Sequence, residues 1–399
     1  MGNCDSITNR SKKISRIVSL DDISGKTTNY SSSFLPKVSS YFERDYPNSS
    51  NSKKNYSVRR INQHEESQYI LPIELAKREE ITKKYKISKH VLGDGATSLV
   101  YLAENSSKQK FAIKRIFKEK NTISNKVMVK EAEICLKLNH KNIIKYYEIY
   151  EDCKYINIVM EQGQTDLFEF LIRSPLGYFP DEIAIDFLIQ ILSAIDYLHS
   201  VNLIHCDIKP ENFVLKIDKG KAELKLVDFG NVRRKPKSKE RLFNYCGTKE
   251  YMAPETLENS GFDEKVDEWA AGVIMFNMWT GADPFSSDTD SEYNDNIKFK
   301  EIKFEYIKNE KLRNLNKKLL NRYMAKRISA KEALEELINI KNEMVYNNSL
   351  DKYKNVNKFE MTMNKSSVKN YSWIFVFNYI IFNDMIWTKI IYVNIVKSY

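Results

Sequence analysis

Residues with catalytic chemistry gather around one short loop and the strand end that follows it. In LIHCDIKPENFVL, the polar residues Asp207, Lys209 and Asn212 occupy a loop after a long apolar stretch. Asp228 ends the next strand, in LVDFG. A carboxylate such as Asp207 can accept a proton from a hydroxyl group, and a cation such as Lys209 can neutralise a phosphate. The Asn212 amide oxygen and the Asp228 carboxylate, completed by substrate phosphates, suit Mg²⁺.

A second group of residues lies upstream. Gly93 and Gly95 in LGDGATSLV follow a strand, and a backbone without Cβ atoms can approach a phosphate closely there. Taken alone, this turn is more typical of a plain hairpin. Lys114 in FAIK lies on a strand, and Glu131 lies on the next helix. A buried lysine needs a carboxylate partner to stay charged and positioned, so we expect Lys114 to pair with Glu131.

The elements that must position these residues change type along the chain. Alternating apolar residues predict strands in KISKHVLGDGATSLVYLAE, KFAIKRIF and YINIVME. Helical spacing predicts helices in VMVKEAEICLKLNH and DEIAIDFLIQILSAIDYLH, and VDEWAAGVIMFNMWTG is apolar all round, as a core helix would be. Ser329 and Glu332 form a capping box that predicts a helix start. Residues 72–84 are predicted to form a short helix before the first strand.

The motifs taken together resemble the eukaryotic protein kinases, because their order and gaps match the family's set. The resemblance covers residues 85–342 and implies an α+β, two-lobed fold. It places a small, antiparallel, β-rich N-lobe with one helix at 85–161 and a larger helical C-lobe at 162–342. The matching residues are Gly93, Gly95, Val100, Lys114, Glu131, His205, Cys206, Asp207, Asn212, Asp228, Phe229, Gly230, Ala253, Pro254 and Glu255.

The resemblance implies transfer of phosphate from ATP, with Mg²⁺, to serine or threonine in proteins. Asp207 would be the catalytic base and Lys209 would contact the γ-phosphate. Asn212 and Asp228 would bind magnesium, and Lys114 would hold the α- and β-phosphates. The residues that the resemblance places around ATP are Leu92, Gly93, Gly95, Val100, Ala112, Lys114, Glu131, Met160, Glu161 and Gly163.

Other positions would have structural roles or indicate the kinase subgroup. The resemblance pairs Arg327 with Glu255 and makes Asp267 an anchor between the catalytic loop and the core helix. The segments DIKPEN and CGTKEYMAPE are similar to serine/threonine kinases rather than tyrosine kinases. The loop GDGATS, with Ser98 in place of a third glycine, looks most like the calcium/calmodulin-dependent group.

The chain departs from the family before its catalytic aspartate, where Cys206 replaces the usual arginine. In the family that arginine meets a phosphate on the activation segment, so we expect activity without such a phosphate. The alternative is that Ser238 or Tyr245 is phosphorylated and uses other basic residues. A pseudokinase, which would bind nucleotide and partners without turnover, is the other reading of the whole chain. The presence of Lys114, Asp207 and Asp228 favours the enzyme.

Acidic residues near the site bear on substrate choice. Glu211 and Asp166 match positions that basic-directed kinases use to bind substrate arginine, while the third such position is Asn277. These residues favour arginine upstream of the target hydroxyl. The equally weighted alternative is that Glu211 is the ordinary residue of its motif and Asp166 holds the ribose.

The first 71 residues are predicted to be a disordered, basic leader. MGNCDS fits the M-G-x-x-x-S pattern of N-myristoylation at Gly2, and Cys4 is a candidate for palmitoylation. A myristoyl chain needs a second signal for stable binding, which Cys4 or a basic cluster on an anionic membrane would supply. The basic cluster consists of Arg10, Lys12, Lys13 and Arg16. The alternative is a flexible leader in which the pattern is accidental.

The net charge and the cysteines indicate which partners and which cellular compartment to expect. The net charge is +10, but scattered lysines do not indicate nucleic-acid binding. None of the five cysteines forms a CxxC pair, which favours a reducing compartment over a disulfide framework or a zinc site. We therefore expect a cytoplasmic protein, at the cytoplasmic face of a membrane if the leader is lipidated.

Residues 343–399 form a tail of open role. No EF-hand pattern follows Asn342, so a built-in calcium sensor is not expected. EELINIKNEMVYNNSLDKYK is either a calmodulin-binding helix or, as we favour, a continuation of the last domain helix. The apolar end from Ser372 to Val396 is a docking tail, a gene-model extension or a poor membrane segment. A transmembrane helix is least favoured, because polar and charged residues interrupt it.

Overall fold

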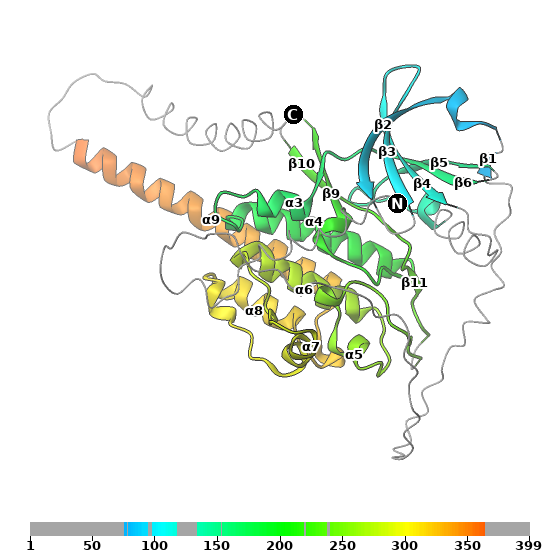
Figure 1. Ribbon diagram of the computed structural model, residues 1–399. Helices are drawn as coiled ribbons and strands as arrows, with labels where there is room; N and C mark the ends of the chain where they lie inside the picture. Colours follow the sequence, from blue (N-terminus) through cyan, green and yellow to red (C-terminus); the bar gives the residue numbers. More distant parts are fainter. Residues whose placement is uncertain are drawn as a thin grey trace, which may run out of the picture.

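The computed structural model describes residues 76–77, 79–94, 98–117, 134–152, 154–218, 221–237 and 240–363. These residues form a sheet-rich lobe and a helical lobe, and Figure 1 shows the strands gathered above the helices. The predicted α+β, two-lobed architecture is confirmed. The leader, Gly2 and Cys4, Gly95, Glu131 and the apolar end from Ser372 lie outside the described residues.

The N-lobe is built on one twisted sheet whose strands follow the order β1-β5-β6-β4-β3-β2. All its neighbours are antiparallel except β1 and β5. Alternating apolar residues produce these strands because one face of the sheet packs on the core. The long strands are β2 (Tyr85–Asp94), β3 (Ser98–Asn105), β4 (Lys110–Phe117), β5 (Tyr146–Glu151) and β6 (Tyr155–Met160).

The segment before the first long strand differs from the predicted helix over 72–84. Its described part forms the two-residue strand β1 (Ala76–Lys77) and the 3₁₀ turn η4 (Ile81–Lys83). Lys77 Nζ donates to Glu148 Oε1 at 2.7 Å, and β1 pairs in parallel with β5. A partner far along the chain therefore holds this segment extended, and local helical spacing does not decide its form.

The C-lobe is built around α4 (Asp181–Ser200) and α6 (Lys265–Thr280), as predicted. α4 packs against α6 and against α9 (Ala330–Met363), the last helix of the described residues. The last turn of α6 ends at Gly281, whose φ of 69° is left-handed. The other α-helices among the described residues of this lobe are α3 (Leu167–Ile172), α5 (Pro254–Leu257), α7 (Asp290–Phe299) and α8 (Glu310–Leu319).

The capping box at the start of α9 is present. Glu332 N–H donates to Ser329 Oγ at 3.3 Å, and Ser329 N–H donates to Glu332 Oε2 at 3.0 Å. From there α9 runs as one helix to Met363, through the segment for which we favoured a continued helix. Among the described helices, α4 is the one long and apolar enough to cross a bilayer, but half of its apolar window is buried inside the lobe.

A hairpin of β9 (Phe213–Asp218) and β10 (Lys221–Leu226) lies above α3 and α4 and beside the N-lobe strands in the view of Figure 1. The register pairs Phe213 with Leu226, at the open end of the hairpin. The short strands β7 (Thr165–Asp166), β8 (Leu203–Ile204) and β11 (Arg233–Arg234) complete the sheets, with β7 beside β9 and β11 beside β8. The open end of the hairpin positions the candidate site.

Candidate active site

The hairpin brings together residues that lie far apart in the sequence. Asn212 directly precedes β9. Asp228 comes after β10 with one residue, Val227, between them, so both lie at the open end of the hairpin. Val227 N–H donates to the Asn212 carbonyl oxygen at 2.8 Å, which ties the two chain segments. The residues that the sequence predicts to bind metal are therefore neighbours in space.

Asp207 lies at the centre of a polar network and is nearly buried. The Asn212 side-chain amide donates to the Asp207 carbonyl oxygen at 2.8 Å and to Asp207 Oδ2 at 3.3 Å. Thr248 Oγ1 donates to Asp207 Oδ1 at 2.8 Å. These contacts fix the orientation of the carboxylate that would accept a proton.

The Lys209 side chain also contacts the Asp207 carboxylate. Its Nζ donates to Thr248 Oγ1 at 2.6 Å and lies 3.3 Å from Asp207 Oδ2. Thr248 was not singled out in the sequence, although it stands in the quoted segment CGTKEYMAPE. Its hydroxyl links the two residues predicted to be catalytic, which no pattern within its own segment reveals.

Lys114 crosses from the N-lobe to the metal-side carboxylate. Its Nζ donates to Asp228 Oδ1 at 2.8 Å, and its side chain is 14% exposed. Burial raises the pKa of Asp228, but the Lys114 ammonium lowers it further, and the net shift is downward. Asp228 therefore stays ionised. The predicted partner Glu131 lies outside the described residues, so that pairing stays a prediction.

The donor set fits a magnesium ion. Both hydrogen bonds of the Asn212 amide nitrogen go to Asp207, which leaves its oxygen end for a ligand role. Asp228 is ionised and half exposed. In the described ranges, no group of three or more His, Cys, Asp or Glu residues is placed to hold a metal. An ion here would rely on one carboxylate, one amide and substrate oxygens, as Mg²⁺ commonly does.

The residues predicted around ATP line up across the N-lobe sheet. The register places Gly93 opposite Val100, Val100 opposite Lys114, and Ala112 opposite Met160. Leu92 stands exposed on β2, while Ala112 and Met160 are buried. The strand pairing thus brings the glycine turn, the lysine and the end of β6 onto three adjoining strands.

The segment after β6 joins the two lobes. Glu161 N–H donates to the Lys145 carbonyl oxygen at 2.8 Å, and the Glu161 side chain is paired with Lys216 on β9. Gly163 lies so near β9 that a Cβ atom there would stand 2.8 Å from Val214 Cβ. Only glycine fits this approach without a shift of the backbone.

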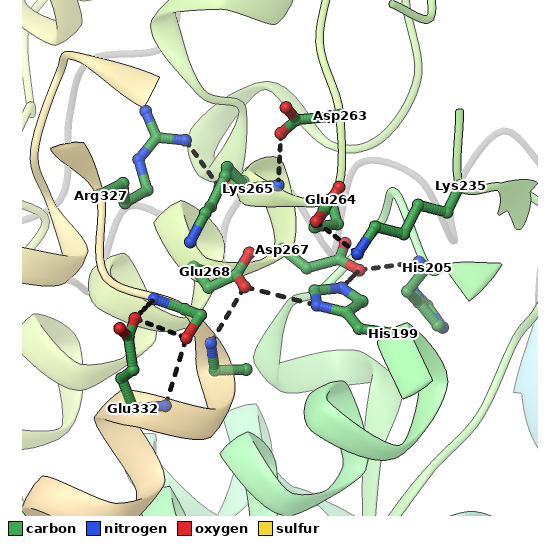
Figure 2. Close-up of polar contacts among 12 residues, drawn as sticks. His199, His205, Lys235, Asp263, Glu264, Lys265, Asp267, Glu268, Arg327 and Glu332 are labelled. Carbon is green, nitrogen blue, oxygen red and sulfur yellow. Dashed lines mark hydrogen bonds and ion pairs between the residues drawn. The ribbon is translucent and has the colours of Figure 1, made fainter. Parts of the chain in front are cut away.

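Asp267 anchors the catalytic loop, as the resemblance implied. Its Oδ2 accepts from His205 N–H at 2.8 Å and its Oδ1 accepts from Cys206 N–H at 2.9 Å. Figure 2 shows His199 between Asp267 and Glu268, with Nε2 at 2.9 Å from Asp267 and Nδ1 at 3.4 Å from Glu268. Burial lowers the pKa of His199, but the two carboxylates outweigh it and raise the pKa to about 10.

The residues weighed for substrate choice occupy different surroundings. Asp166 caps α3 by accepting from Glu169 N–H at 2.8 Å. Asn277 is buried in α6 and donates to the Ala282 carbonyl oxygen at 2.7 Å, so it does not face a substrate. Among the described side chains, Glu211 Oε2 is one of the buried atoms without a hydrogen-bond partner, and burial raises the pKa of Glu211.

The comparison with known families decides the assignment of the chain. The model of the family described as "Protein kinase domain" matches residues 85–337. The chain belongs to the protein kinase family. Protein kinases use ATP and Mg²⁺, which agrees with the donor set above. The recognition made from the sequence motifs is confirmed.

Three relatives illustrate the similarity. Myosin light chain kinase A of Dictyostelium discoideum is 37% identical over 55% of this chain and 74% of its own length. Calcium/calmodulin-dependent protein kinase type IV of Rattus norvegicus is 33% identical over 55% of this chain and 46% of its own length. Aurora kinase of Dictyostelium discoideum is 34% identical over 52% of this chain and 53% of its own length. The chain thus spans about half the length of the last two.

Proposed function

We propose that this protein is a serine/threonine protein kinase that transfers the γ-phosphate of ATP to hydroxyl groups of proteins. The observation that carries the proposal is the convergence on Asp207 of Asn212, Thr248 and Lys209, beside the Lys114–Asp228 ion pair. Asp207 as the base, Lys209 as the cation that contacts the phosphate, and Asn212 and Asp228 as metal ligands then lie close together, as phosphoryl transfer requires.

Catalysis would consist of positioning and charge neutralisation. Lys114 would hold the α- and β-phosphates, and Lys209 would contact the γ-phosphate in flight. Asp207 would orient the substrate hydroxyl and accept its proton, while Thr248 keeps both catalytic side chains in place. Magnesium, held by Asn212 and Asp228, would neutralise phosphate charge when bound.

The test is transfer of labelled γ-phosphate from ATP-Mg²⁺ to a generic serine/threonine substrate, with Asp228→Asn as the comparison. We expect labelling by the wild type and a loss of at least about a hundredfold in the variant. If folded wild-type protein labels nothing but binds ATP, the chain is a nucleotide-binding scaffold and the proposal fails. An Asp186→Asn variant, changed on the exposed face of α4, should label normally.

The proposal extends to the leader and the compartment. Myristoylation of Gly2, palmitoylation of Cys4 and the basic residues after them would hold a cytoplasmic enzyme on an anionic membrane. The pattern MGNCDS supports this. Cells fed an alkyne analogue of myristate should label the wild type but not Gly2→Ala, which should leave the membrane fraction. Equal membrane recovery of both proteins would contradict the tether.

The substrate preference is proposed from Glu211. Its unpartnered, buried Oε2 atom supports recognition of a substrate arginine, which would supply the missing donors. Peptides with and without arginine upstream of serine should differ in kcat/KM for the wild type. The difference should shrink in Glu211→Gln, and no difference in the wild type would contradict the preference.

A further inference from the structure

Two cysteines that are distant in the sequence meet beside the catalytic loop. Cys206 lies just after β8 and Cys246 lies in the segment that follows β11. Both side chains line one small cavity of about 20 Å³, roughly the space of one water.

The two chain segments that contain Cys206 and Cys246 run side by side. The proximity of the two cysteines therefore follows from the backbone and not from one side-chain rotamer. A Cβ atom at Gly247 would stand 2.5 Å from the Cys206 carbonyl oxygen. One position further along each segment, Thr248 Oγ1 donates to Asp207 Oδ1 at 2.8 Å. Asp267 holds the Cys206 backbone through its 2.9 Å hydrogen bond. Successive contacts thus hold the two segments that carry the cysteines side by side.

The two thiols differ in their surroundings. Cys206 is buried and Cys246 is partly exposed. Burial raises the pKa of Cys206, whereas the neighbouring Cys206 side chain and the Arg233 charge lower the pKa of Cys246. Burial of Cys246, Asp267 and Asp207 act in the opposite direction, and the net shift of the Cys246 pKa is downward. A partly exposed thiol with a lowered pKa next to a buried thiol is the arrangement of a redox-sensitive pair.

We propose that Cys206 and Cys246 form a reversible oxidation site whose reactant is a hydroperoxide such as H₂O₂. The Cys246 thiolate attacks a peroxide oxygen, the O–O bond breaks, and the leaving hydroxide takes a proton to become water. The Cys206 sulfur then attacks the sulfenic acid on Cys246 and the S–O bond breaks. The leaving hydroxide combines with the Cys206 proton, so one peroxide becomes two waters and two thiols become one disulfide.

Disulfide formation would disturb the catalytic residues. An S–S bond is only about 2.05 Å long, which is shorter than any non-bonded contact between two sulfur atoms, so one segment must move. Thr248 lies two residues after Cys246 and holds both Asp207 and Lys209. A misplacement of about 1 Å can lower turnover about a hundredfold. This consequence rests on the proposed kinase activity, whereas the crosslink itself does not.

The site is tested on the full chain. Reduced protein is treated with H₂O₂, its free thiols are alkylated, and it is digested without reductant for mass spectrometry. We expect a crosslinked peptide pair joining Cys206 to Cys246, its disappearance after dithiothreitol, and a parallel loss and recovery of turnover. The Cys246→Ser and Cys206→Ser variants should each lack the crosslink. A Cys4→Ser/Cys153→Ser variant, which retains the pair, should form it.

The outcomes separate the site from the kinase assignment. Alkylation of Cys206 after peroxide treatment, with Cys246 carried to the sulfinic acid, would overturn the site. A complete crosslink with unchanged turnover would overturn its effect on catalysis. If the reduced protein transfers no phosphate at all, the kinase assignment fails, while the peptide map still decides whether the two cysteines join.

Discussion

Arg327 and Glu255 form a two-pronged ion pair in the interior of the C-lobe. Arg327 Nη1 donates to Glu255 Oε1 at 2.6 Å, and Nη2 donates to Oε2 at 3.0 Å. The arginine side chain is 0% exposed, and its guanidinium also lies over the Trp269 ring at 5.1 Å from the centroid. Its Nη1 donates to the Lys265 carbonyl oxygen as well, at 2.6 Å. The pair therefore joins the start of α5, the start of α6 and the turn before α9.

Removal of the arginine should destabilise the C-lobe strongly. Arg327→Ala leaves the Glu255 carboxylate buried and unpaired, which should lower the free energy of unfolding by about 3–5 kcal/mol. Denaturant unfolding measures this change. The matched control is Lys341→Ala, which removes an exposed pair with Asp186 at 2.5 Å and should cost about 0–1 kcal/mol. Equal losses in both variants would contradict a structural role for the buried pair.

The sequence predicts the elements whose form depends on their own residues. α4 and α6 are recognisable because their apolar positions recur at helical spacing or continue all round, which the buried interior requires. β1 cannot be recognised from its own residues, because its extended form depends on pairing with β5. Ion pairs of Lys77 and Lys84 with Glu148 on β5 hold this segment as well. Residues 72–84 were therefore predicted as a helix.

The same distinction holds in the candidate site. Asp207, Lys209, Asn212 and Asp228 could be identified because spaced motifs carry them, and the hairpin of β9 and β10 brings them together. The role of Thr248 could not be identified, since it arises when the activation segment returns to the catalytic loop. The proximity of Cys206 to Cys246, which line one small cavity, was missed for the same reason.

The buried His199 should make stability depend on pH at the alkaline side. Its pKa is raised to about 10 in the folded protein, from 6.5 for the ordinary side chain. A raised pKa stabilises the folded state fully below the unfolded value, and this contribution is lost as pH rises through about 10. The stability difference between the wild type and His199→Gln should therefore be largest below pH 6.5 and shrink toward pH 10.

Unfolding curves at several pH values measure the His199 effect. The control is His90→Gln, since His90 is exposed on β2 and should give a small difference at every pH. A constant difference between wild type and His199→Gln from pH 6 to about pH 10 would show that the imidazole is not held charged by Asp267 and Glu268.

The Thr248 hydroxyl should affect turnover more than substrate binding. It donates to Asp207 at 2.8 Å and accepts from Lys209 at 2.6 Å, so its loss should free both catalytic side chains to reorient. Thr248→Ala should lower kcat about ten- to a hundredfold with little change in KM for ATP. Thr248→Ser, which keeps the hydroxyl, should retain most activity.

Steady-state kinetics separate this role from a merely structural one. The control is Thr289→Ala, which removes a hydroxyl far from the catalytic residues in the sequence. The Thr289 hydroxyl accepts from Glu292 N–H at the start of α7, and its loss should leave kcat unchanged. If Thr248→Ser is as impaired as Thr248→Ala, the hydroxyl does not position the catalytic residues and only the shape of the side chain matters.

Gly163 should be intolerant of any side chain because the connection between the lobes passes too near β9. A Cβ atom there would stand 2.8 Å from Val214 Cβ and 2.9 Å from Val214 Cγ2. Gly163→Ala should therefore push this connection away from β9, with a cost of about 1–3 kcal/mol in the free energy of unfolding and an increase in KM for ATP.

Removal of the opposing atoms should relieve the clash. In a double-mutant cycle with Val214→Gly, which removes both Cβ and Cγ2, the double variant should bind ATP better than Gly163→Ala alone. Strictly additive losses would place the clash elsewhere, and an unchanged KM for ATP in Gly163→Ala would show that this connection does not line the nucleotide site.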